Sequence, residues 1–141
     1  MNPIVRIFLA ANVGIYRVTS GKIGGTMFGG KVLLLTTKGH KSGQSRTVPV
    51  MYFENGADRV VIASAGGSPV HPAWYKNLSQ DPNVTVEVPG KRYAARATVA
   101  TGDERERIWS KVIAEQPRFA GYAAKAGGRE IPVVVLKEAA S

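Results

Sequence analysis

The chain has 141 residues and a formal net charge of +9 at pH 7, and 44% of its residues are hydrophobic. This length and hydrophobic share predict one domain, residues 1–141, with a core of its own, and they exclude a disordered chain. The absence of cysteine excludes disulfides and thiolate nucleophiles, and it favours a cytoplasmic location. The positive charge favours anionic partners such as phosphates, acidic cofactors, nucleic acid or an anionic membrane surface.

The charge is distributed unevenly along the chain. No acidic residue precedes Glu54. The basic residues of this first part are Arg6, Arg17, Lys22, Lys31, Lys38, Lys41 and Arg46. The N-terminal third therefore carries the positive field, and an anionic ligand is expected to bind there.

Residues 1–20 predict an amphipathic helix, with Asn2 suited to the N-cap and Pro3 to the first helical position. The apolar run between Arg6 and Arg17 has only about half of the roughly 20 residues that a membrane-spanning helix needs. The helix is therefore expected either to pack on the domain or to lie in the lipid interface, with its arginines at the headgroups. The second alternative would place the protein at the inner face of the membrane.

The remainder of the chain predicts a small split antiparallel β-barrel. Residues 21–31 are rich in glycine and are expected to cross irregularly from the helix to the first strand. Turn signals at 54–58 and 89–91 favour hairpins, and the short spacing excludes repeated βαβ crossovers. The expected fold is therefore mainly β (α+β), because a small barrel buries such strands best. The predicted strands are 32–37, 47–53, 59–65, 84–88, 92–100 and 131–136.

Two helices and a looser third are expected to flank the barrel. The first covers residues 72–78 and the third covers 116–126. The second begins at a predicted capping box formed by Thr101 and Glu104. Its apolar face consists of Ile108, Trp109, Val112 and Ile113.

A basic loop follows the first predicted strand. Gly39 and Gly43 are expected to allow positive φ angles that let backbone N–H groups converge on an anion. Lys41 and Arg46 add positive charge and hydrogen bonds, which suits a phosphate. The alternative is an ordinary basic hairpin turn.

A second cluster suits a flat ring. Residues 62–67 end a strand in small residues, where a planar ring can approach the backbone, and Trp74, Tyr75 and Asn77 follow. The alternative is that the two aromatic residues only anchor their helix in the core. His71 is expected to be a loop or packing residue. Because the sequence offers no persuasive metal site or hydrolase triad, a bound cofactor is expected to supply the chemistry of an enzyme.

Four spaced motifs occur in one order along nearly the whole chain. They are Gly39-x-Lys41-Ser42-Gly43-x-x-Arg46-x-x-Pro49, Ala63-Ser64-x-x-Gly67, Pro72-x-Trp74-Tyr75-x-Asn77-Leu78 and Ile131-Pro132-Val133-Val134-Val135. This order resembles the deazaflavin-dependent nitroreductase family. The resemblance implies an oxidoreductase with a split β-barrel that binds reduced coenzyme F-420 and passes its hydride to quinones, nitroaromatics or other activated acceptors.

The resemblance also implies roles for individual residues. Lys41 and Arg46 are expected to bind the phosphate of the coenzyme, whose acidic oligoglutamate tail accounts for the acid-free N-terminal third. Ser64 and Tyr122 are the candidates to hydrogen-bond the acceptor or relay a proton to it. The other cofactor-binding positions implied are Ser42, Gly43, Pro49, Val50, Ile62, Ala63, Ser64, Gly67, Trp74 and Asn77.

One departure from the family pattern bears on the acceptor. Members that activate nitroimidazole prodrugs carry a cluster of tyrosines where this chain has Gln116, Phe119 and Tyr122. A quinone-like acceptor is therefore expected. The rival functions are an FMN- or haem-binding split barrel and a non-catalytic deazaflavin carrier, whereas no recognisable motif supports a nucleic-acid module. Monomer and homodimer are both left open.

Overall fold

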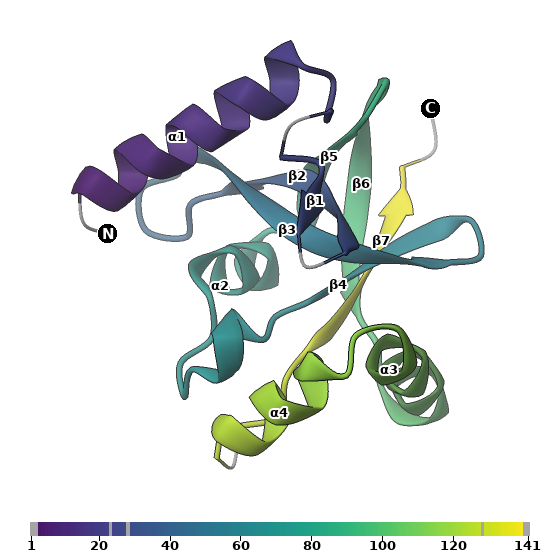
Figure 1. The fold of residues 1–141 in the computed structure, drawn as a ribbon. Helices are drawn as coiled ribbons and strands as arrows, with labels where there is room; N and C mark the ends of the chain where they lie inside the picture. Colours follow the sequence, from purple (N-terminus) through teal and green to yellow (C-terminus); the bar gives the residue numbers. More distant parts are fainter. Residues whose placement is uncertain (1–2, 23, 28, 128, 140–141) are drawn as a thin grey trace.

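The computed structural model describes residues 3–22, 24–27, 29–127 and 129–139 (Figure 1). Asn2, the predicted N-cap, lies outside these residues. The elements in chain order are α1 (Pro3–Val18), β1 (Thr26–Met27), β2 (Gly30–Lys38), β3 (Ser45–Asn55), β4 (Asp58–Ile62), the 3-10 turn η1 (Ala65–Gly67), α2 (Ala73–Gln80), β5 (Asn83–Val88), β6 (Lys91–Val99), α3 (Gly102–Glu115), α4 (Arg118–Lys125) and β7 (Val133–Glu138).

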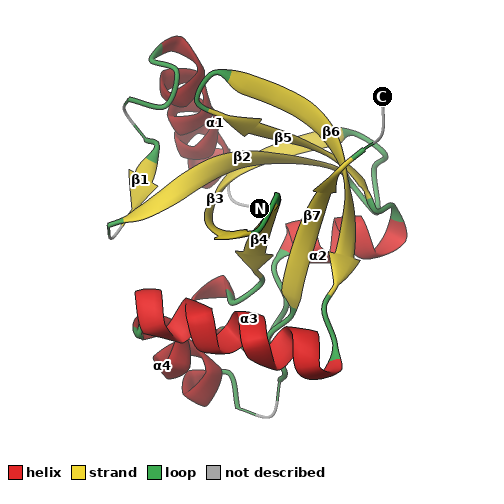
Figure 2. Cartoon of the chain, turned by 90° about the vertical axis from the view of Figure 1, so that its right-hand side faces the viewer, coloured by secondary structure: helices red, strands yellow, loops and turns green. Residues whose placement is uncertain are grey.

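Six strands close into an antiparallel barrel, as predicted (Figure 2). They pair in the order β2-β3-β4-β7-β6-β5, and β5 pairs back with β2. The predicted hairpin turns are confirmed at Gly56, with φ 62°, and at Gly90, with φ 79°. The glycine-rich crossing contains one element that was not predicted, the short β1, which pairs with the start of β2.

Alternating side chains of the strands fill the barrel. Leu33 and Leu35 of β2 are fully buried and belong to a cluster with Val61, Val86 and Val134 of facing strands. α2 adds Leu78 to the same cluster. Burial of such aliphatic side chains is the main favourable contribution to folding. Because α2 packs on this core, it lies at a fixed position beside the end of β2.

α3 and α4 cover the opposite face of β3, β4 and β7 (Figure 2). Ile108 and Val112 of α3 are buried there, and Phe119 of α4 packs edge-on against Phe53 with ring centroids 5.7 Å apart. All the predicted flanking helices are therefore present. Thr101 is the N-cap of α3, as predicted. The predicted capping box is wrong, because the Thr101 side chain makes no capping hydrogen bond.

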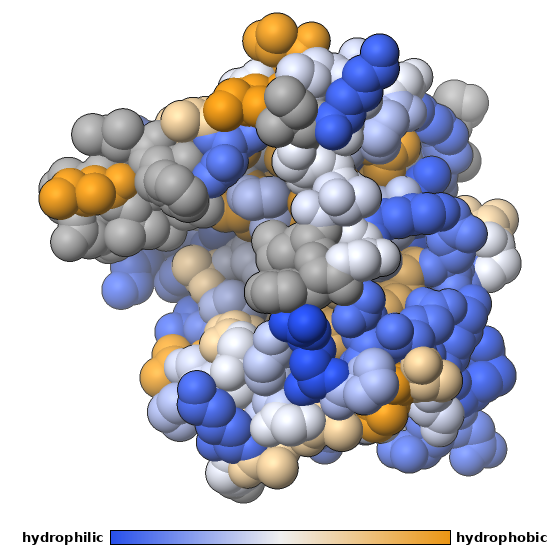
Figure 3. Space-filling view, viewed as in Figure 1, coloured by the Kyte–Doolittle hydropathy of each residue, from blue (hydrophilic) through white to orange (hydrophobic). Residues whose placement is uncertain are grey.

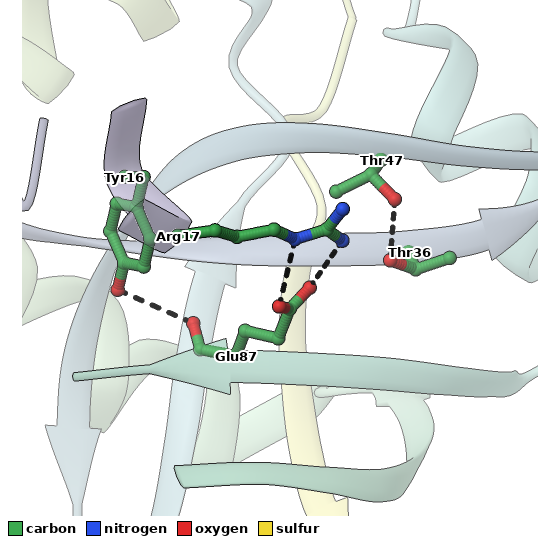
Figure 4. A network of polar contacts seen from close by, with 5 residues as sticks. All are labelled: Tyr16, Arg17, Thr36, Thr47 and Glu87. Carbon is green, nitrogen blue, oxygen red and sulfur yellow. Dashed lines mark hydrogen bonds and ion pairs between the residues drawn. The ribbon is translucent and has the colours of Figure 1, made fainter. Parts of the chain in front are cut away.

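α1 is anchored to the outside of the barrel near its C-terminal end (Figure 4). Tyr16 is buried against Leu34, and its hydroxyl donates to the carbonyl oxygen of Val32 at 3.0 Å. Burial raises the pKa of Tyr16 to about 12, so the phenol stays neutral. Arg17 donates from Nε and Nη2 to the two carboxylate oxygens of Glu87, at 3.0 and 2.8 Å. This part of α1 packs on the barrel, as one of the two alternatives predicted.

β4 ends earlier than predicted. The strand stops at Ile62, and the N–H of Ala63 donates to the carbonyl oxygen of Pro132 at 3.0 Å, just before β7. Ala65, Gly66 and Gly67 then take positive φ angles of 49°, 64° and 85°. A β-strand cannot continue through such angles. The small residues that were interpreted as a strand end therefore form a turn, called here the 63–68 segment.

Candidate functional site

The basic loop between β2 and β3 is closed by its own hydrogen bonds. The N–H of Gly39 donates to the carbonyl oxygen of Gln44 at 2.8 Å, and the N–H of Gly43 donates to that of Gly39 at 2.8 Å. The N–H of Gln44 donates to Ser42 Oγ at 3.2 Å. These three N–H groups are used within the loop, so they do not take part in the expected convergence of backbone donors on an anion.

The two loop glycines are needed for different reasons. Gly43 has a φ angle of 73°, as predicted, whereas Gly39 is not among the positive-φ glycines. A Cβ atom at position 39 would instead lie 2.8 Å from Ser42 Oγ and 3.1 Å from the carbonyl oxygen of Gln44. Gly39 is therefore required by a close approach of the two sides of the loop.

Asn77 of α2 holds this loop in place. Its side chain is 4% exposed, and its Oδ1 accepts from the backbone N–H of His40 at 2.9 Å. His40 Nδ1 lies 2.6 Å from the same oxygen, so Nδ1 carries the proton. Asn77 Nδ2 donates to Thr37 Oγ1 at 3.0 Å. The polar atoms of Asn77 are thus directed at the loop, and Thr37 and His40 are functional residues that the sequence did not single out.

A cavity of about 550 Å³ lies between this loop, α1 and α2. The surface is hollowed beneath the projecting end of α1 (Figure 3). The cavity brings together five of the residues predicted to bind the cofactor, namely Lys41, Ser42, Arg46, Trp74 and Asn77. Thr37, His40 and Ala10 of α1 line it too. The side that α1 covers is therefore also the side that carries the basic loop.

A second pocket, of about 220 Å³, shares one lining residue with the first. Trp74 lines both pockets. The predicted residues in the second pocket are Pro49, Val50, Ile62, Ser64 and Tyr122. Met51 and Phe119 add apolar surface, and Arg118 adds a positive charge that the sequence interpretation missed. The structure thus places a basic cavity and a mainly apolar pocket with hydroxyl groups in its wall on two sides of Trp74.

Three predicted cofactor-binding residues line neither pocket. Gly43 shapes the basic loop, and Ala63 is fully buried. At Gly67 a Cβ atom would lie 3.0 Å from both Lys125 Cβ and the carbonyl oxygen of Tyr122. Gly67 therefore lets the 63–68 segment approach α4, and its contribution to the pocket is indirect.

The positive field of the N-terminal third is concentrated at the basic loop. Arg17 is paired with Glu87 at 2.8 Å, and Lys31 is paired with Glu54 at 3.2 Å. Lys41 and Arg46, in contrast, line the larger cavity. The acids supplied by later parts of the chain thus neutralise basic residues away from the site and leave the cavity electropositive.

Comparison with known proteins decides between the rival functions. The model of a family described as F420H2-dependent quinone reductase matches residues 8–138. The chain belongs to this family. F420H2 is the reduced form of coenzyme F-420, so the resemblance to deazaflavin-dependent enzymes is confirmed.

Relatives in this family cover most of the chain. An F420H2-dependent quinone reductase of Mycobacterium tuberculosis is 37% identical over 86% of this chain and 84% of its own length. The structure of an F420-H2 dependent reductase is 37% identical, with a TM-score of 0.68, and covers 75% of this chain and 93% of its own. A structure described as a domain-swapped dimer is 33% identical, with a TM-score of 0.70, and covers 90% of this chain and 96% of its own. A haem-binding protein of Mycobacterium smegmatis, at 19% identity and a TM-score of 0.57, shares the fold alone.

Proposed function

We propose that this chain is a reductase that uses reduced coenzyme F-420 to reduce a quinone. The observation that carries the proposal is that Trp74 lines both the basic cavity and the apolar pocket. The relative that is 37% identical is named for the same reaction. The coenzyme, when bound, supplies the hydride, and the residues of the chain bind, orient and exclude water.

The larger cavity fits the anionic part of the coenzyme. Lys41 and Arg46 supply positive charge, and Ser42 supplies a hydroxyl group. Asn77 restrains the loop in advance through its hydrogen bonds to His40, which lowers the entropy cost of binding. A volume of about 550 Å³ also lies within the range of roughly 300–1,000 Å³ that is typical of cofactor sites.

The smaller pocket fits a flat redox ring and the acceptor. Val50, Ile62 and Trp74 provide walls that exclude water from the path of the hydride. Hydride transfer depends mainly on proximity and alignment, and such walls fix both. Ser64, Arg118 and Tyr122 line this pocket, which supports a role for the two hydroxyl groups in hydrogen-bonding an acceptor oxygen and for the positive charge in favouring the negative charge that develops there.

One assay tests both the proposed quinone reduction and the roles of the Ser64 and Tyr122 hydroxyl groups. Rapid mixing of the protein and reduced coenzyme with a menaquinone analogue is expected to give acceptor-dependent oxidation of the coenzyme. Ser64→Ala and Tyr122→Phe should each lower turnover about 10-fold or more, because both remove a polar partner of the acceptor. Coenzyme affinity should change less than turnover, since neither residue lines the larger cavity proposed to bind the anionic part of the coenzyme.

Ser110→Ala removes an exposed hydroxyl from α3 and should leave turnover at the wild-type level. Turnover that is unchanged in both Ser64→Ala and Tyr122→Phe would remove these residues from the mechanism. A nitroimidazole is expected to be a poorer acceptor than the quinone, because Phe119 packs edge-on against Tyr122 and presents no hydroxyl group. Equal turnover of the two acceptors would contradict that preference.

We infer that α1 also contacts the inner face of the membrane, where a lipid-soluble quinone is found. Ile15 and Val18 are 44% and 87% exposed, although neighbouring residues pack on the barrel. Among the described residues no helix is both long and apolar enough to cross a membrane. Replacing Ile15 and Val18 together with serine should therefore weaken sedimentation with anionic liposomes. Val99→Ser, at an exposed apolar position of β6, is the control, and equal binding of both variants would contradict the inference.

A further inference from the structure

Arg129 makes a dense set of hydrogen bonds between the end of α4 and the start of β7. Its Nε donates to the carbonyl oxygen of Ser68 at 2.9 Å. Its Nη1 donates to the carbonyl oxygen of Ala63 at 3.1 Å, and its Nη2 donates to that of Ser64 at 2.7 Å. The fork of one guanidinium group therefore holds three carbonyl groups of the 63–68 segment.

This segment forms part of the wall of the smaller pocket. Ser64, Ala65 and Gly66 line that pocket, whereas Arg129 does not. The positive φ angle of 49° at Ala65 is unfavourable for a residue with a Cβ atom. Backbone in such a conformation persists only where its surroundings over-determine it. The hydrogen bonds from Arg129, which lies outside the pocket lining, provide that restraint.

We propose that Arg129 is a positioning residue that fixes the acceptor side of the site by holding the 63–68 segment. Lysine cannot replace it, because an ammonium group lacks the planar fork that reaches several carbonyl groups at once. The position of the Ser64 hydroxyl in the pocket then depends on Arg129, a residue 65 positions further along the chain. The inference rests on the proposed function only for its kinetic readout.

His71 completes the arrangement at the start of α2. Its Nδ1 lies 2.9 Å from Arg129 Nη1 and accepts a hydrogen bond, so the imidazole is neutral there. Burial, together with the charges of Arg129 and Lys76, lowers the pKa of His71. The ring of Tyr75 packs against it at 4.8 Å between centroids. The ordinary pKa of histidine is about 6.5, and the pKa of His71 is lower. When the pH falls through this lowered pKa, the imidazole becomes a cation in contact with the Arg129 guanidinium, which would weaken the hydrogen bonds that hold the 63–68 segment.

The kinetic test compares Arg129→Ala and Arg129→Lys with Arg105→Ala. Arg105 is the matched control, because its guanidinium also donates to a backbone carbonyl, that of Ile131 at 2.9 Å, outside the 63–68 segment. Both Arg129 variants should lower kcat/KM for the quinone about 10- to 100-fold. Their Kd for reduced coenzyme should change less than kcat/KM, since the basic loop proposed to bind the anionic part of the coenzyme is not touched. Arg105→Ala should keep kcat/KM near the wild-type value, and millimolar guanidinium should restore turnover in Arg129→Ala.

A second measurement does not depend on activity. Amide hydrogen exchange should be faster across residues 63–68 in Arg129→Ala and unchanged across the basic loop, residues 39–46. Protection like that of wild type, or acceptor kinetics like those of Arg105→Ala, would overturn the proposal. If the wild-type protein oxidises no coenzyme with any quinone, the proposed function fails while the exchange result still decides the role of Arg129.

Discussion

Replacing Lys41 and Arg46 together with alanine is expected to abolish measurable binding of reduced coenzyme F-420. Both side chains line the larger cavity, beside a loop whose own backbone donors are largely used internally. A hydrogen bond to a charged group contributes about 1.5–3 kcal/mol. Each single replacement should therefore raise Kd on the order of 10- to 100-fold. Fluorescence titration of the apo protein with reduced coenzyme measures the effect directly.

Lys137→Ala is the matched control for this loss of charge. Lys137 is exposed on β7 and lines neither pocket of the site, so its removal lowers the net charge without touching the basic loop. Its Kd should stay near the wild-type value, and added salt should weaken binding in both proteins. A double variant of Lys41 and Arg46 that still binds like Lys137→Ala would show that the phosphate is held elsewhere.

Asn77→Leu should weaken both the fold and the binding of the coenzyme. The replacement keeps the volume but removes the partner of the His40 N–H and of Thr37 Oγ1. A buried polar group left without a partner costs about 1–3 kcal/mol. We therefore expect a lower Tm in thermal unfolding, together with a Kd that rises at least about 10-fold because the loop is no longer restrained.

Asn77→Asp separates the two effects. It keeps the acceptor oxygen Oδ1 but replaces the Nδ2 donor to Thr37 with a second oxygen, and it adds a negative charge that repels the phosphate of the coenzyme. Its affinity should therefore fall more than its stability. Asn83→Ala, at an exposed position whose side chain donates to Asp81, should change neither quantity strongly. A lower Tm in Asn77→Leu with unchanged Kd would reduce Asn77 to a purely structural residue.

The barrel could be predicted because its signals are local. The alternation in β2 places Leu33 and Leu35 in the core, and Gly56 and Gly90 mark hairpin turns within a few residues of the strands that they join. Both signals rest on the two-residue period of a strand and on the positive φ angles open to glycine. The basic loop was found for the same reason, since its glycines and cations lie together in the sequence.

The restraints on the site could not be predicted because they join distant parts of the chain. Asn77 bonds to residues 37 and 40 positions away, and Arg129 bonds to carbonyl groups more than 60 positions away. The resemblance implies that Ala63 and Gly67 bind the cofactor, and this stays a prediction. The sequence did not show that Ala63 donates to Pro132, just before β7, or that Gly67 approaches α4. A single sequence shows which residues are small or polar, but it does not show which distant residues they will contact or hydrogen-bond.

The path of β3 past both pockets has a further consequence. Arg46 lines the larger cavity and Val50 lines the smaller one, and both belong to this one strand. A strand rises about 3.3 Å per residue, so these four steps set a separation of about 13 Å. Under the proposed function, β3 would therefore fix the distance between a phosphate bound at Arg46 and a ring bound at Val50. Inserting one residue between them would lengthen this distance and turn Val50 to the other face of the sheet.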